Sequence, residues 1–246
     1  MTDVDHQYNN VRLLPKQPKG PLLNVPFIIV FLITLCFCIY FIPQYFFSDQ
    51  LYMESLELFS FIPVLFKADP LAFCHTIFSY SLMHGSFQHV AINMAWLLVF
   101  GSPLVRHLGS LRFLVFWMLM AAISVLIYFV FHQESMVPLV GASGAISGMM
   151  GAIVRYDFSP MHFDENMQNG RFFGPLLSVK QALSSKIVII YISIWLIVDF
   201  IIGVSSFLFE GDSIAIAWEA HISGFVSGFL FVGFFDILRA KSKTIA

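Results

Sequence analysis

A serine and a histidine, each set among glycines, are the residues of this sequence best suited to nucleophilic chemistry. Ser143 lies between Gly141 and Gly144, and His221 precedes Gly224 by less than one helical turn. A serine hydroxyl is a weak nucleophile until a neighbouring base accepts its proton, and imidazole is the commonest such base. We therefore predict that Ser143 is the nucleophile and His221 its general base.

A third polar cluster contains His84, His89 and Asn93. His89 and Asn93 are four residues apart, so on a helix they lie on one face and can direct donors into the same cavity. Such donors stabilise the negative oxygen that forms when a hydroxyl attacks a carbonyl. A helix that begins near Ser143 would add its free N–H groups. His89 and Asn93 are thus predicted oxyanion donors, helped by the glycines on either side of Ser143, with His84 as a further candidate.

The glycines also have a simpler interpretation. Gly144 and Gly148 are four residues apart, as are Gly224 and Gly228, and small residues at this spacing let two membrane helices approach closely. Most such faces serve packing alone. The two interpretations agree here, because helices that pack through these faces bring the serine and the histidine of the two motifs together.

The composition indicates a membrane protein. Of the 246 residues, 58% are hydrophobic and 11% are charged, whereas a soluble domain carries about 25% charged residues. The mean hydropathy is +0.81. The net charge of −2 argues against a nucleic-acid partner. The partner expected of such a surface is the lipid bilayer.

Stretches that are poor in charged residues predict how often the chain crosses the membrane. A helix needs about 20 apolar residues to cross the hydrocarbon core. We therefore expect an all-α bundle of six transmembrane helices at residues 26–47, 86–105, 113–131, 136–154, 187–208 and 217–235. The predicted organisation is a cytoplasmic N-terminal segment at 1–25, a six-span membrane domain at 26–238 and a basic cytoplasmic tail at 239–246.

The basic residues predict the orientation. An even number of spans puts both termini on one side, and if that side is the cytoplasm, every Lys and Arg except Lys67 lies inside. This distribution follows the positive-inside rule. Both termini are therefore expected in the cytoplasm. The three polar clusters then all open spans that run inward, so they lie at a similar shallow depth and can meet.

The fourth stretch is expected to be irregular in its outer third. Pro138 and Gly141 should delay the helix until about Gly141 or Ala142. Non-helical backbone at membrane depth is tolerated where protein buries it or a water-filled cavity satisfies it. Ser143 is therefore expected at the floor of such a cavity. The apolar outer loop, at about 49–85, is expected to pack on the bundle rather than to lie in the membrane interface.

At the glycine-rich motifs the sequence resembles the rhomboid family of intramembrane proteases. The stretch 141–144 is similar to that family's Gly-x-Ser-Gly motif, and the stretch 220–228 is similar to its Ala-His-x-x-Gly-x-x-x-Gly motif. The histidine-rich entry to the second span is similar as well. The resemblance covers about residues 26–238.

The resemblance implies an activity and a site. Rhomboid proteases cut transmembrane segments of membrane-protein substrates near the outer membrane face, with a Ser-His dyad and without a third acidic residue, a metal or a cofactor. Ser143 and His221 would form that dyad, and His89 and Asn93 would help to form the oxyanion site. The resemblance also implies a multi-pass protein of the bacterial inner membrane. Two departures are a first outer loop without the Trp-Arg pair of some members and Val105 where several bacterial members carry Glu.

Asp199 is the one acidic residue well inside an apolar stretch. An ionisable residue there is costly and is a candidate for function, so Asp199 could relay a proton or complete a triad. It could equally tie two helices together through a hydrogen bond. We favour the second interpretation, because Asp199 belongs to a different span at an undetermined depth.

Other functions remain open. Two of His84, His89 and His221 could ligate a b-type haem, although this leaves the Gly-Ala-Ser-Gly motif unexplained. A broken span is also how transporters build a site, but the sequence lacks inverted-repeat symmetry. A catalytically inactive rhomboid-like binding protein is a further alternative, and such proteins typically lose the serine or histidine kept here. The three cysteines form no metal-ligand pattern and no His-Glu-x-x-His motif occurs, so no metal is expected.

Overall fold

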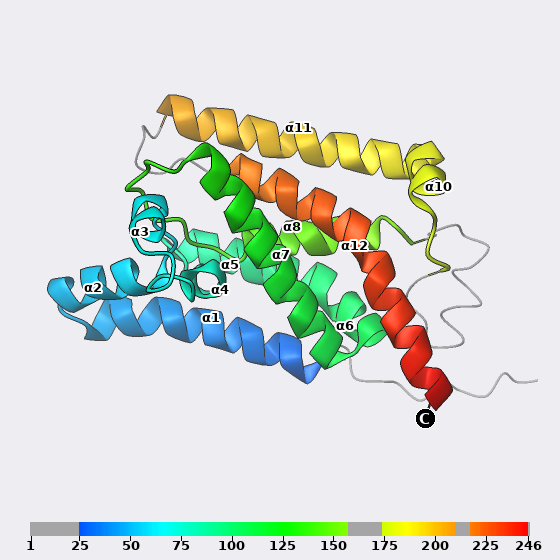
Figure 1. The fold of residues 1–246 in the computed structure, drawn as a ribbon, viewed down its shortest axis with the longest axis horizontal. Coiled ribbons are helices and arrows are strands. Elements are labelled where there is room, and N and C mark those ends of the chain that lie inside the picture. The colour runs from blue at the N-terminus through cyan, green and yellow to red at the C-terminus, as the bar shows by residue number, and fades with distance from the viewer. Residues whose placement is uncertain (1–24, 157–173, 210–216, 246) are drawn as a thin grey trace, which may run out of the picture.

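The computed structural model describes residues 25–156, 174–209 and 217–245. Within these ranges the chain is helical and has no β-strand beyond two isolated bridges, which confirms the predicted all-α fold for this part. The elements are α1 (Phe27–Phe46), α2 (Asp49–Phe59), α3 (Pro63–Ala68), α4 (Thr76–Ser79), η1 (Tyr80–Leu82), α5 (Phe87–Trp96), η2 (Leu97–Gly101), α6 (Ser102–Leu108), α7 (Ser110–Phe131), α8 (Ser143–Ile153), α10 (Val179–Ser184), α11 (Lys186–Phe209) and α12 (Trp218–Ile245). Figure 1 shows α1 along one side of the bundle and α11 along the opposite side, with α7, α8 and α12 between them.

Among the described residues, four helices are long and apolar enough to cross a membrane, judged by length and composition. They coincide with the first, second, third and sixth predicted spans, at Phe27–Phe46, Phe87–Leu108, Ser110–Phe131 and Trp218–Leu238. The second of these is continuous from α5 through the π turn η2 into α6. The fourth and fifth predicted spans correspond to α8, with 11 residues, and α11, with 24 residues. Six membrane crossings therefore stay a prediction.

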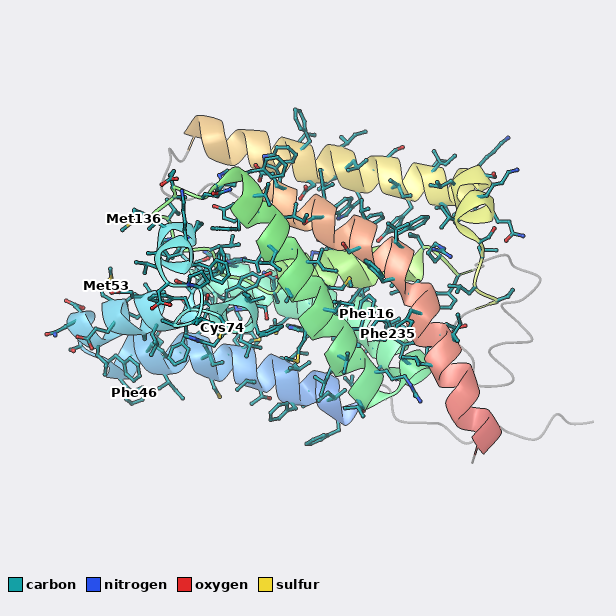
Figure 2. The ribbon with its side chains drawn as sticks, viewed as in Figure 1. Phe46, Met53, Cys74, Phe116, Met136 and Phe235 are labelled. Atoms are coloured by element: carbon teal, nitrogen blue, oxygen red, sulfur yellow. The ribbon has the colours of Figure 1, made fainter. Side chains whose placement is uncertain are left out.

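The outer segment between α1 and α5 packs on the bundle through its buried side. Phe61 is fully buried, and its ring lies edge-on to that of Phe129 on α7, with centroids 6.0 Å apart. Tyr80 donates its hydroxyl to the carbonyl oxygen of Ala121 at 2.8 Å. These contacts agree with the expected packing for the part of the loop that follows α2. The side chains of α2 are less covered, and Figure 2 shows Met53 pointing away from the bundle.

The opposite end of the bundle is held by polar contacts that do not involve position 105. Val105 is buried among apolar side chains. His107 on α6 pairs with Asp236 on α12, with Nε2 2.7 Å from Oδ1. Arg155, just after α8, donates to the carbonyl oxygen of Phe229 on α12 at 2.6 Å. These contacts join α6 and the end of α8 to α12.

The short helix α8 is buried along most of its length. Glycine, alanine and serine make up most of its residues, and small side chains let neighbouring helices come close. Helices α7 and α12 cover it and meet each other at Phe116 and Phe235, whose ring centroids are 5.2 Å apart (Figure 2). This packing brings the starts of α8 and α12 together.

Candidate active site

Ser143 and His221 meet where α8 and α12 begin. The Oγ atom of Ser143 lies 2.8 Å from Nε2 of His221. Ser143 is the first residue of α8, His221 lies near the start of α12, and both are half-buried. A separation of this size suits transfer of a proton from a hydroxyl to an imidazole.

The segment that leads into Ser143 is non-helical, and the protein satisfies part of its backbone. Leu139 exchanges hydrogen bonds with Phe61, at 3.1 and 2.9 Å. The N–H of Gly141 donates to the carbonyl oxygen of Tyr80 at 3.0 Å. The helix starts at Ser143, one or two residues later than predicted, so first-turn N–H groups without helical partners lie next to the hydroxyl.

Glycines on α8 and α12 determine how closely these helices approach. A Cβ atom on Gly224 would overlap the carbonyl oxygen of Gly144, and one on Gly228 would overlap that of Gly148. On its other side, a Cβ on Gly144 would lie 2.7 Å from Cβ of Ser124 on α7. Backbone therefore meets backbone at both levels. The two small-residue faces thus pack against each other next to the contact of Ser143 with His221.

Gly141 has a conformation and surroundings that suit glycine alone. Its φ is +127°, which is strained for any residue with a Cβ atom. A Cβ there would also lie 2.8 Å from Nε2 of His89. The His89 ring thus packs directly on the backbone two residues before Ser143.

His84 lies outside the long helices and packs edge-on to His89, with ring centroids 5.1 Å apart. Burial, and then the neighbouring His89 imidazole, lowers the pKa of His84. The ring is therefore neutral near pH 7. It can support the His89 ring by packing.

Asn93 is buried on α5 and directs its amide toward its own helix. Its Nδ2 donates to the carbonyl oxygen of His89 at 3.0 Å, while the backbone N–H of His89 donates to the capping hydroxyl of Ser86. An amide nitrogen carries two hydrogens, so one donor of Asn93 is left for another partner. The structure thus places His89 beside the segment that precedes the serine and Asn93 one turn further along the same helix.

Asp199 contacts the other side of the His221 ring. Its Oδ1 atom lies 2.7 Å from Nδ1 of His221. Both interpretations of Asp199, as a relay or as a tie between helices, require such a hydrogen bond. The sequence singled out Asp199 because it is an acid within an apolar stretch. It did not predict His221 as the partner, because the partner depends on how α11 packs on α12.

The ring nitrogens of His221 are both engaged in this arrangement. A haem ligand needs a free ring nitrogen, so the contacts disfavour His221 as an axial ligand. Among the described residues, no three His, Cys, Asp or Glu side chains are grouped so that they could hold a metal ion.

Comparison with known proteins assigns the family. The model of the Rhomboid domain matches residues 73–236, more than half of the chain. The chain therefore belongs to the rhomboid family, as its motifs indicated. It is similar to proteins named Rhomboid protease GlpG from two strains of Klebsiella pneumoniae, each 25% identical over 166 residues that cover 68% of this chain and 50% of the relative. The chain spans about half the length of the curated relatives it matches.

Proposed function

We propose that this protein is an intramembrane serine endopeptidase that cleaves transmembrane segments of membrane-protein substrates near the outer membrane face. The observation that carries the proposal is the 2.8 Å contact between Oγ of Ser143 and Nε2 of His221, at the start of a buried helix. Membership of the rhomboid family supports the same reaction class.

The geometry suggests a two-step acyl transfer. Oγ of Ser143 attacks the substrate carbonyl carbon as Nε2 of His221 takes the hydroxyl proton, and the imidazolium then protonates the departing amine. Water repeats the sequence on the acyl-enzyme and releases the second product. The first-turn N–H groups of α8, together with His89 and Asn93, would donate to the oxyanion in each step.

The length of α8 supports a site below the membrane surface. Eleven residues extend about 16 Å, roughly half of a hydrocarbon core of about 30 Å. The irregular chain before Ser143 would occupy the outer part, where Phe61 and Tyr80 bond backbone groups of Leu139 and Gly141 that lipid could not satisfy. We infer that α8 and α11 complete a six-span domain with both termini in the cytoplasm, in the bacterial inner membrane.

The expected substrates are single-span proteins with helix-destabilising residues near their outer end. An intact helix keeps its carbonyl groups in hydrogen bonds and hides them from a nucleophile. A substrate has to unwind locally before it reaches Ser143. The protein itself brings no cofactor to this reaction in our proposal.

The test is cleavage of a transmembrane substrate and labelling by a fluorophosphonate, measured on the detergent-solubilised full chain. Ser143→Ala should abolish both, and His221→Ala should abolish cleavage and most labelling, because no other base contacts the serine hydroxyl among the described residues. The matched control is Ser147→Ala, which removes a buried hydroxyl one turn along the same helix. It should keep wild-type cleavage.

Two outcomes would redirect the proposal. If wild-type protein neither cleaves nor labels, a catalytically inactive rhomboid-like binding protein becomes the better description. If His221→Ala cleaves like wild type while Ser143→Ala does not, the base is misassigned, and His84 or His89 is the next candidate.

A further inference from the structure

We propose that Asp199 positions His221 for catalysis, so that this chain works with a Ser143–His221–Asp199 relay. The inference rests on the proposed protease function and deepens it. A Ser-His dyad alone needs no acid, so the carboxylate of Asp199 is a third group beside the proposed dyad.

The first argument is the geometry of the imidazole. Its Nδ1 lies 2.7 Å from Oδ1 of Asp199, and its Nε2 lies 2.8 Å from Oγ of Ser143. A carboxylate only accepts hydrogen bonds, so Nδ1 must carry the ring hydrogen when Asp199 is ionised. The lone pair is then on Nε2, where it faces the serine hydroxyl. Asp199 thus selects the tautomer that general-base catalysis needs.

The second argument is the isolation of the carboxylate. Asp199 is 9% exposed, and among the described residues its Oδ2 atom has no hydrogen-bond partner. Among the described residues, the His221 imidazole is thus the hydrogen-bond partner of this carboxylate. Proton transfer from Ser143 creates an imidazolium beside it, and the attraction between the two charges favours that step.

The third argument is that packing fixes the register of the pair. Trp195 on α11 stacks on Phe225 of α12, with ring centroids 4.5 Å apart and planes 19° from parallel. Trp195 and Asp199 are four residues apart on α11, and His221 and Phe225 are four residues apart on α12, so the two pairs occupy adjacent turns of antiparallel helices (Figure 1). The aromatic stack therefore keeps Asp199 opposite the imidazole.

The test compares Asp199→Asn with Asp236→Asn in the full chain. Asp236 bonds His107 at the same 2.7 Å distance at the other end of the bundle, so it is a matched pair outside the site. Asp199→Asn should lower kcat on the order of 10²- to 10⁴-fold with little change in KM. Asp236→Asn should leave kcat near wild type. If both variants lost kcat equally, the loss would come from breaking any buried His–Asp pair rather than from positioning His221. That result would overturn the inference.

A spectroscopic measurement separates positioning from mere support of the fold. Nitrogen-15 NMR of histidine-labelled protein should show Nδ1–H and unprotonated Nε2 for His221 in the resting wild type, and a mixture of tautomers in Asp199→Asn, because an amide can either donate or accept. An Nε2–H tautomer in the wild type would overturn the relay even if the variant failed to fold. Unchanged kcat in Asp199→Asn would also overturn it, while an inactive Ser143→Ala would still leave the protease proposal standing.

Discussion

Helix α12 has two very different neighbours in α8 and α11. Against α8 it packs backbone on backbone, through Gly224 on Gly144 and Gly228 on Gly148. Against α11 it packs through side chains, chiefly the stack of Trp195 on Phe225. The first contact lies beside the pair Ser143 and His221, the proposed nucleophile and base, and the second lies beside the contact of Asp199 with His221. The proposed dyad thus lies next to the backbone contact, which has the least freedom to rearrange.

The two contacts also differ in their surroundings. Most of α8 is buried, whereas α11 exposes a row of apolar side chains that includes Ile190, Ile194 and Ile197. In a bilayer such a row would face lipid. A contact between glycines buries no side chain, and it has no side-chain rotamers through which it could adjust. An aromatic stack buries more area per residue, and its rings can change rotamer. The comparison predicts unequal consequences for changes on the two sides of α12.

The largest effect is expected at the glycine contact. Gly228→Ala would put a methyl group into the backbone carbonyl of Gly148, and no side chain there can move aside. The helices must separate, so cleavage should fall below detection. The variant should lose about 3 kcal/mol of stability. Thermal unfolding in detergent measures the loss of stability. Substrate cleavage and fluorophosphonate labelling of Ser143 measure the loss of the site.

The control for this change lies on the same helix. A Cβ atom on Gly233 would meet only Cδ2 of Leu176, at 3.5 Å, which is ordinary contact. Gly233→Ala should therefore unfold at or slightly above the wild-type temperature and cleave normally. Normal cleavage by Gly228→Ala would show that the site tolerates a wider separation of α8 and α12 than the structure implies.

An intermediate effect is expected on the third side of the site, where α5 supplies side chains. His89→Ala and Asn93→Ala should each slow cleavage by about 10- to 1,000-fold, as loss of a single oxyanion donor does in other enzymes. Steady-state cleavage with a folded-protein control by thermal unfolding measures this. Ile92→Ala, which shortens an exposed side chain on the same helix, should have little effect. Unchanged rates in both polar variants would remove them from the mechanism.

The sequence carries much of this architecture in short-range signals. The four long apolar helices and the late start of α8 follow from charge-poor stretches and from Pro138 and Gly141. The small-residue faces at Gly144 and Gly148 and at Gly224 and Gly228 follow from their spacing, which marks a close-packing face on each helix. These features depend on residues that are near one another in the chain or repeat at a helical period.

Other features of the site depend on the register between segments that are far apart in the chain, and no short-range pattern in the sequence predicts them. The partner of Asp199 is set by how α11 slides along α12, and an apolar helix with one acid does not specify that position. The amide of Asn93 could have pointed to the site or to its own helix from the same sequence, and the structure shows it on the carbonyl of His89. The π turn at Leu97–Gly101 is likewise invisible in a uniformly apolar stretch.

The smallest effect is expected at the side-chain contact between α11 and α12. Trp195→Ala removes the stack on Phe225, a pair worth about 1 kcal/mol beyond its buried area. Such a change alters the equilibrium constant between the aligned and displaced arrangements by about fivefold, so kcat should fall by no more than about that factor while Ser143 still labels with fluorophosphonate. Ile194→Ala, at the adjacent and exposed position, should leave kcat unchanged. If Trp195→Ala instead abolished labelling, as Gly228→Ala should, α11 would hold the serine and histidine together as firmly as α8 does, and the contrast between the two sides of α12 would be wrong.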